Sequence, residues 1–259
     1  MSSVIADASP QQAHQTAIPQ RRAALIAGLA YVLLTVLALF AIRVLDGSTQ
    51  PDNPAATVAH IVNSKALFRS GLPAFFIVLI ADVVVAWALY VFFQRTSREL
   101  SLFAAWFRLL YVAIAAAALL NIPVILKLVD GTGSVTALEK GQRDVQVMLS
   151  LDAYNYGFFL ALVFFGVHLL LLGFVMVKSD DAPSILGMLV ALAGLGYVVI
   201  NLARVVLPDY RDYENLLLLL LAVLAVPGEF GLVGWLLWRG GKARPAAVST
   251  PPVDRDLAG

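Results

Sequence analysis

The chain alternates between long apolar stretches and short polar ones. Six stretches reach about 20 residues or more, which is the length that an α-helix needs to cross a bilayer. They cover residues 23–42, 71–93, 102–128, 154–177, 185–207 and 216–238. The third is long for one span, so we expect a bend near Asn121 and Pro123 to absorb the excess. Strands of a membrane barrel would alternate in polarity over about ten residues, and these stretches do not.

The polar segments predict how the rest of the chain is organised. Residues 1–20 are polar, and the end from residue 240 is rich in Gly and Pro, so both are predicted to be disordered tails. Residues 21–239 then form a single transmembrane domain. The first apolar stretch exceeds the roughly 7–15 apolar residues of a signal peptide, so we expect it to stay as an uncleaved helix.

The first connection between spans contains a separate helix signal. Asn53 followed by Pro54 is typical of a helix start. Val58, Ile61 and Val62 then fall on one helical face, which predicts a short amphipathic helix on the membrane surface or at the end of the bundle. His60 on this helix is expected to be solvated.

Composition supports a membrane protein. Of 259 residues, 60% are hydrophobic and 14% charged, and mean hydropathy is +0.84, whereas soluble domains carry about 25% charged residues. We therefore predict an all-α integral membrane bundle of about six transmembrane helices, with the lipid bilayer as its main partner. The net charge of +1 offers no electrostatic footprint for nucleic acid. Cysteine is absent, which excludes disulfides, thiolate metal sites and thiol nucleophiles.

Lysine and arginine predict the orientation. With the N-terminus inside, the inner segments carry Arg21, Arg22, Arg95, Arg98, Lys178, Arg239, Lys242 and Arg244. The outer segments also hold basic residues, but these are mixed with more numerous acidic ones. The positive-inside rule then places the chain in the cell (inner) membrane with both termini in the cytoplasm.

Four ionisable side chains interrupt the apolar spans: Asp82, Arg108, His168 and Glu229. A charge at the centre of a span costs about 2.5–3.5 kcal/mol on insertion scales, so such residues normally face protein or water and have a partner. At about 1.5 Å per residue, all four lie in the inner half of the bilayer on four different helices. We expect them to form one polar cluster. One arginine cannot neutralise two carboxylates, so either His168 is protonated or one carboxylate holds a proton.

A second polar group is expected near the outer surface. Asp152 at the predicted start of the fourth span is expected to meet Asn201 and Arg204 near the outer end of the fifth. Tyr154 and Tyr197 are expected nearby as interfacial hydrogen-bonding partners. Charges at helix ends reach water easily, so a structural role is favoured. Small residues are spaced along the last two spans for close helix packing, namely Gly187, Ala191, Gly194, Gly228, Gly231 and Gly234.

Signatures of membrane enzymes are missing from the sequence. His168 is the sole histidine within a predicted span, so a haem held by two histidines is not predicted, and the zinc-protease motif H-E-x-x-H is absent. No serine has a base at a recognisable spacing. We therefore expect no cofactor and no metal.

Several phrases together resemble a known family. In chain order they are RRAALIAGLAYVLL (21–34), SKALFRSG (64–71), WFRLLY (106–111), YGFFLALVFFGVHLLLLGFVM (156–176), ILGMLVALAGLGYVV (185–199), LPDY (207–210) and PGEFGLVGWLL (227–237). The set resembles the bacterial family catalogued as domain of unknown function 4386, over most of residues 20–240. The resemblance implies a multi-pass membrane protein without an assigned activity, and it brings no catalytic residues.

Three functional hypotheses remain from the sequence. The first is a membrane scaffold or accessory protein with a structural ionic cluster, bound to a membrane-protein partner or to a second copy. The second is a small proton-linked transporter or permease that uses Asp82 or Glu229, which predicts a water-filled path to those carboxylates. The third is an intramembrane enzyme, which predicts a lipid-accessible cleft with the carboxylates at its wall.

Overall fold

The computed structural model describes residues 19–47, 50, 53–207 and 210–241, and this part of the chain is helical without any strand. The all-α membrane bundle predicted from the sequence is confirmed. The predicted tails, residues 1–20 and 240–259, fall almost wholly outside the described residues. Gln20 already belongs to the first helix, and Gly240 and Gly241 to the last.

The helices follow one another along the chain with short connections. Their bounds are α1 Gln20–Asp46, α2 Pro54–Asn63, α3 Lys65–Phe93, α4 Arg98–Leu119, α5 Asn121–Asp130, a 3-10 turn Gly133–Ala137, α6 Lys140–Val177, α7 Ser184–Val206 and α8 Tyr210–Gly241. Six helical segments are long and apolar enough to cross a membrane, with α4 and α5 counted as one. Each contains or nearly matches one of the six predicted stretches.

The observed helices extend beyond the apolar stretches, most of all at α6. This helix begins at Lys140, where Glu139 and Gln142 form a capping box, so Asp152 lies well inside the helix and not at its start as predicted. Polar residues outside the bilayer can continue a helix, and hydropathy therefore misses its true end. The bend expected near Asn121 is present, because α4 stops at Leu119 and α5 restarts at Asn121.

Helix α2 is the predicted short helix of the first connection. Asn53 caps it by accepting a hydrogen bond from the backbone N–H of Ala56 at 3.0 Å. Its buried face carries Thr57 and Ile61, whereas Val62 is exposed, so the predicted apolar face is rotated away from Val62. His60 is exposed, as expected.

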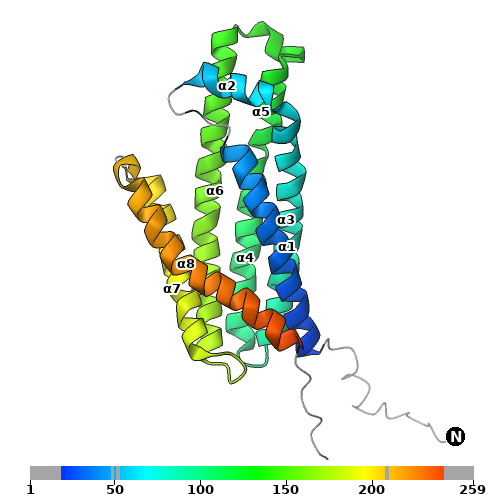
Figure 1. Ribbon diagram of the computed structural model, residues 1–259, viewed down its shortest axis with the longest axis vertical. Helices are drawn as coiled ribbons and strands as arrows, with labels where there is room; N and C mark the ends of the chain where they lie inside the picture. Colours follow the sequence, from blue (N-terminus) through cyan, green and yellow to red (C-terminus); the bar gives the residue numbers. More distant parts are fainter. Residues whose placement is uncertain (1–18, 48–49, 51–52, 208–209, 242–259) are drawn as a thin grey trace, which may run out of the picture.

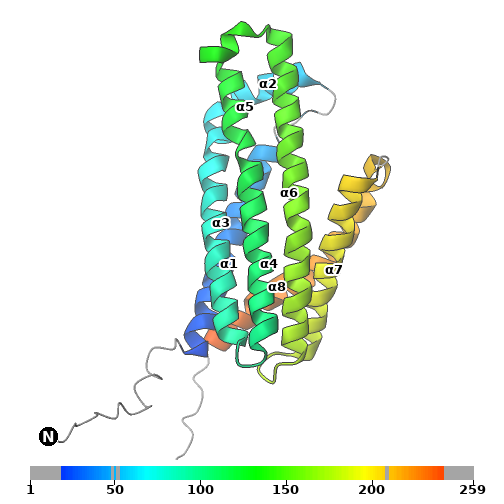
Figure 2. The same ribbon diagram turned by 180° about the vertical axis from the view of Figure 1, so that it is seen from behind.

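The six spans form a ring. Each packs against the next in the order α1, α3, α4, α6, α7, α8, and α8 closes the ring against α1. Residues 19 and 241 lie at the same end of the bundle, here called the terminal end (Figure 1). Towards the opposite end, α7 and α8 diverge from α6, as both Figure 1 and the reverse view in Figure 2 show.

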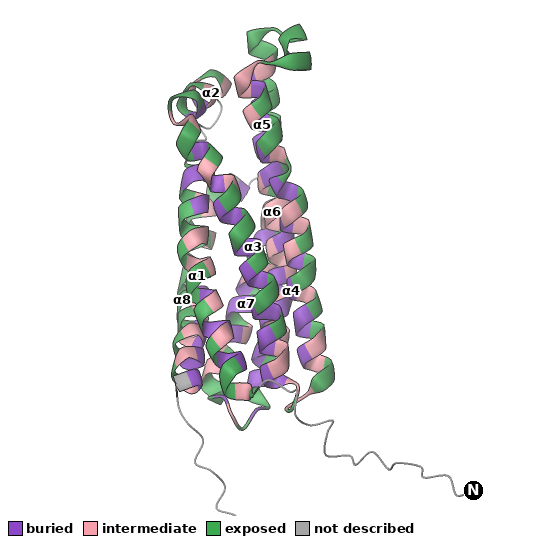
Figure 3. Cartoon of the chain, turned by 90° about the vertical axis from the view of Figure 1, so that its right-hand side faces the viewer, coloured by how far each residue is buried: buried purple, intermediate pink, exposed green. Residues whose placement is uncertain are grey.

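Burial differs strongly around this ring. In the most apolar stretch of α3, 56% of residues are buried, against 22% in α1 and 17% in α8. Exposed residues cover the outward faces along the length of the bundle (Figure 3), and many of them are large and apolar. These faces contact lipid, and α1 and α8 form the more open side of the ring.

Glycines let α6 and α7 approach closely. A Cβ added to Gly173 would lie 2.5 Å from the carbonyl oxygen of Gly187 and 2.6 Å from the nitrogen of Ala191. A Cβ on Gly194 would lie 2.6 Å from the carbonyl oxygen of Gly166. The predicted small-residue face of α7 is therefore the face that packs on α6. Close van der Waals packing of this kind holds membrane helices together, because the surrounding lipid is as apolar as the side chains.

We predict that Gly173→Ala destabilises the protein. The new methyl group must push α7 away, and overpacking of this kind costs about 1–3 kcal/mol. The thermal unfolding midpoint of the purified protein should fall. Gly234→Ala is the matched control, because a Cβ there meets nothing within 4 Å. Equal midpoints for the two variants would contradict this packing.

Candidate functional site

Arg108 lies at the centre of the ring and is completely buried. Its guanidinium donates from Nε and Nη2 to Oδ1 of Asp82, at 3.0 and 2.5 Å. Nη1 donates to the hydroxyl of Tyr31 at 2.6 Å and lies 3.0 Å from Nε2 of His168. The ring of Phe165 also lies 5.3 Å below the guanidinium. One side chain thus connects α4 to α1, α3 and α6.

The four residues predicted to cluster occupy one layer of the bundle. Counted from the terminal end of each observed helix at 1.5 Å per residue, they lie about 14–18 Å deep. Arg108 lies about 15 Å from that end, deeper than the apolar stretch from residue 102 implies, because α4 begins at Arg98 after the N-cap Ser97. The structure brings Asp82 and His168 into direct contact with Arg108. Glu229 does not touch Arg108, but it lines one cavity together with Asp82 and Arg108.

The hydrogen bonds of His168 determine its protonation. Nδ1 lies 2.8 Å from the carbonyl oxygen of Ala104, which can only accept, so Nδ1 carries the proton. Nε2 faces Nη1 of Arg108, which can only donate, so Nε2 is an unprotonated acceptor. His168 is therefore a neutral imidazole and adds no positive charge to the layer.

Glu229 has a different environment from Asp82. Its Oε1 accepts a hydrogen bond from the hydroxyl of Tyr197 at 2.8 Å, and its side chain is half-buried. Among the residues that the structure describes, it forms no ion pair. Sequence reasoning placed both carboxylates with Arg108, but the arginine uses its donors on Asp82, Tyr31 and His168.

The charges around the cavity do not balance. Asp82 pairs with Arg108, and Arg204 lies 3.5 Å from Glu214. With His168 neutral, the carboxylate of Glu229 is left without a cation in this set. A carboxylate within a membrane span that lacks a cation needs a proton, a positive ligand or water beside it, so Glu229 is the charged group of this layer whose partner can be exchanged.

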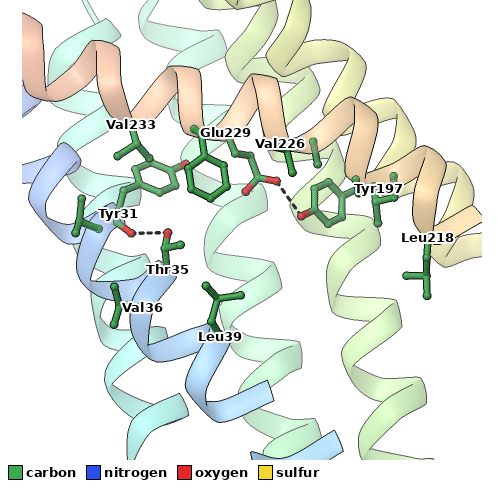
Figure 4. Close-up of a pocket in the computed structure, with 14 residues that line it drawn as sticks. Tyr31, Thr35, Val36, Leu39, Tyr197, Leu218, Val226, Glu229 and Val233 are labelled. Atoms are coloured by element: carbon green, nitrogen blue, oxygen red, sulfur yellow. Dashed lines mark hydrogen bonds between the residues drawn. The ribbon is translucent and has the colours of Figure 1, made fainter. Parts of the chain in front are cut away.

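Two cavities meet at Glu229. One has a volume of about 610 Å³ and is lined by Asp82, Arg108, Tyr111, Asn201 and Arg204, among others. The other has a volume of about 520 Å³ and a largely apolar wall from α1 and α8. Both are lined by Tyr31, Tyr197 and Glu229, and we call them together the Glu229 chamber. Figure 4 shows these three side chains converging from α1, α7 and α8.

Asp82 and Asn201 both line the larger cavity. Tyr111, on the same wall, is a hydrogen-bond partner of the Asp82 carboxylate. Oδ1 of Asn201 is buried and accepts no hydrogen bond from the described residues. Asn201 therefore keeps one acceptor for a hydrogen-bond donor such as water or an ammonium group.

The second predicted group is assembled in part. Asn201 donates to the carbonyl oxygen of Tyr197 at 2.9 Å. Arg204 donates to the hydroxyl of Tyr210 at 2.6 Å and lies 4.4 Å over the ring of Phe159. Both residues line the larger cavity, whereas Asp152 is exposed and is not among its lining residues.

Sequence reasoning missed two tyrosines and one carboxylate of the chamber. Tyr31 and Tyr111 lie in apolar spans, and Glu214 lies next to the last span. Tyr197 was expected beside the outer group, and it donates to Glu229 instead. A buried tyrosine hydroxyl normally needs a hydrogen-bond partner, so a tyrosine in mid-span is the signal that could have found them. The described residues contain no group of three or more histidine, aspartate or glutamate side chains arranged for a metal ion.

We predict that Asp82→Asn strongly destabilises the protein. It leaves the charge of Arg108 buried without a counterion, which costs about 3–5 kcal/mol. The control is Asp181→Asn, because the pair of Asp181 with Arg239 is about one-third exposed and such pairs contribute about 0–1 kcal/mol. The comparison uses the thermal unfolding midpoints of the two purified variants. Similar decreases in midpoint would mean that Asp82 is not needed to stabilise the buried charge of Arg108.

We also predict that His168 is neutral and protonated at Nδ1. In nitrogen NMR of histidine-labelled protein, its Nδ1 should give the signal of a protonated ring nitrogen and its Nε2 that of an unprotonated one. The variant His168→Gln assigns the signals among the three histidines of the chain. Signals of two protonated ring nitrogens would contradict the prediction, because His168 would then be a cation that could balance Glu229.

Comparison with known proteins agrees with this architecture. Residues 26–240 match the family described as "Domain of unknown function (DUF4386)". The chain is similar to an uncharacterized protein of Archaeoglobus fulgidus, with 29% identity over 194 residues that cover 75% of this chain and 97% of the relative. No solved structure matches. The resemblance noted in the sequence is confirmed: this chain belongs to the DUF4386 family of membrane proteins, for which no function is assigned.

Proposed function

We propose that this protein is a small membrane transporter, or permease, whose binding site is the Glu229 chamber. The observation that carries the proposal is a carboxylate without a counterion, inside a ring of six spans, on the wall of two cavities. A purely structural carboxylate at this depth would be expected to have a cation beside it. An exchangeable site must instead be able to lose and regain its partner.

The volume and lining of the chamber support the proposal. Cavities of about 520 and 610 Å³ fall in the range of about 300–1,000 Å³ that small-molecule sites occupy. The mixture of apolar wall and a few converging polar groups is also typical of such sites. A scaffold with a dry ionic core would not need this space.

The scaffold hypothesis is retained for one part of the cluster. The network of Asp82, Arg108 and His168 connects three spans with paired donors and acceptors, which suits a fixed structural role. We therefore propose that this network stabilises the helix bundle and that Glu229 binds and releases the ligand. The third hypothesis, an intramembrane enzyme, has no specific observation in its favour.

Proton linkage follows if Glu229 binds a proton when it lacks another partner. The titratable and charged groups that share its cavity are Tyr31 on α1, Asp82 on α3, Arg108 and Tyr111 on α4, Tyr197 and Arg204 on α7, and Glu214 on α8. The two cations among them already have carboxylate partners, because Arg108 pairs with Asp82 and Arg204 with Glu214. Binding of a cationic substrate at Glu229 would then displace the proton.

The predicted membrane placement forms part of the proposal. Six spans return the chain to the side on which it starts, and the positive-inside rule favours the cytoplasm for that side. The protein would lie in the cell (inner) membrane, with residues 21–239 as one domain. Association with a membrane-protein partner or with a second copy stays a prediction.

We predict that water reaches the chamber, and cysteine labelling tests this because the chain has no natural cysteine. Leu218 lines both cavities and is 41% exposed, whereas its neighbour Leu219 is 62% exposed and lines neither cavity. A charged, membrane-impermeant thiol reagent should label Leu218→Cys and leave Leu219→Cys, on the lipid face, protected. A transporter exposes its site to each side in turn, so labelling should occur in both right-side-out and inverted vesicles.

Two labelling outcomes would contradict the transporter proposal. Protection of Leu218→Cys in both vesicle types, with the variant folded, would mean a dry cavity and would favour the scaffold. Labelling from one side alone would indicate a binding protein without transport. Asn155→Cys, on another wall of the larger cavity, serves as a second reporter in case the first disturbs α8.

A further inference from the structure

The smaller cavity opens towards the lipid between α1 and α8. Its wall includes Val36, Leu39, Val226 and Phe230, which are all exposed. These two helices are also the least buried of the ring. Figure 4 shows the aliphatic side chains of α1 and α8 on either side of this space. A molecule dissolved in the membrane can therefore reach the chamber sideways without crossing the water phase.

The inner end of this cavity is polar. Glu229 lies there with Tyr31 and Tyr197, and Thr35 lies one turn along α1 from Tyr31. The hydroxyl of Tyr197 uses its hydrogen on Oε1 of Glu229, and that of Tyr31 accepts from Arg108. The Glu229 carboxylate is the one group at this end without an opposite charge among the described residues.

Charge and shape together select one ligand chemistry. An ionised carboxylate favours a cation with N–H donors, such as an ammonium group, and the long apolar wall favours an apolar body. Anions are disfavoured by Glu229, and a fully polar cation would leave the apolar wall unfilled. Oδ1 of Asn201, a buried acceptor without a partner among the described residues, adds a site for an N–H group beside the adjoining cavity.

We propose that the Glu229 chamber binds an amphiphilic amine, with its ammonium group on the carboxylate of Glu229 and its apolar body between α1 and α8. This inference rests on the proposed function, since it names the substrate class of the same site. The ammonium group comes either from a free amphiphilic amine or from the ethanolamine headgroup of a lipid. The two sources share the same recognition chemistry.

Binding of dansylcadaverine to the full chain in phosphatidylcholine nanodiscs tests the proposal. This probe carries a primary amine on an aromatic body, and energy transfer from the four tryptophans of the chain reports the bound fraction. The N-acetylated probe has the same body without the charge, and a dansyl carboxylate has the opposite charge. The amine should bind at least about tenfold more tightly than either, as expected for a charged hydrogen bond.

Two variants test whether the carboxylate of Glu229 binds the ammonium group of the probe. Glu229→Gln keeps the size and a hydrogen bond to Tyr197 but removes the charge, so it should weaken amine binding about tenfold or more. Glu99→Gln removes an exposed carboxylate at the start of α4 and should leave binding unchanged. The comparison of the three probes on the wild-type chain needs no variant, so it decides the question even if Glu229→Gln does not fold.

Competition separates the two sources of the ammonium group. Displacement of the probe by phosphatidylethanolamine added to the nanodisc indicates a lipid headgroup, and displacement by octylamine alone indicates a free amine. Equal binding of the amine and acetylated probes, tighter binding of the carboxylate, or no effect of Glu229→Gln would overturn the inference. If Leu218→Cys is nevertheless labelled, the transporter proposal survives that failure.

Discussion

The buried charge of Arg108 is the constraint on which the centre of the structure depends. A guanidinium cannot leave water for a bilayer interior without hydrogen-bond acceptors and a counterion arranged around it, because the desolvation cost is several kcal/mol per ion. Asp82, Tyr31 and His168 meet this need from three other helices. The relative rotation and depth of α1, α3, α4 and α6 are thereby tied to one side chain. Close glycine contacts then attach α7 to α6 without further charges.

This arrangement explains why Glu229 stands apart. The donors of Arg108 are committed to the first four helices of the ring, and α8 lies on its more open side, where fewer residues are buried. The carboxylate of Glu229 therefore receives a hydroxyl from Tyr197 and no cation. The wall that carries the paired Arg108 and Asp82 therefore faces the lightly packed helix α8 across the cavity. This difference suits a site whose ligand enters and leaves from the side of α1 and α8.

The sequence predicted more of the fold than of the site. Runs of about 20 apolar residues are a strong signal because the bilayer offers the backbone no hydrogen bonds, so six spans were predictable. The bend near Asn121 and the helix after Asn53 were readable from local chemistry. Ends such as Lys140 were not, because a helix can continue into water without a hydropathy signal. Tyr31 and Tyr111 were overlooked, because an aromatic residue in an apolar run looks like ordinary packing.

The sequence by itself determined that this chain is a six-span membrane protein and which four ionisable residues lie within its spans. That all four lie towards the same end of their helices was readable too, from position in the span and the helical rise. The depth of Arg108 was underestimated, because α4 begins before its apolar stretch. The tertiary structure decided which of them touch. Rotation of each helix about its axis leaves hydropathy unchanged, yet it determines whether Arg108 faces Asp82 or Glu229. The neutral state of His168, the unpaired carboxylate and the cavities beside it follow from those rotations and from nothing in the order of residues alone.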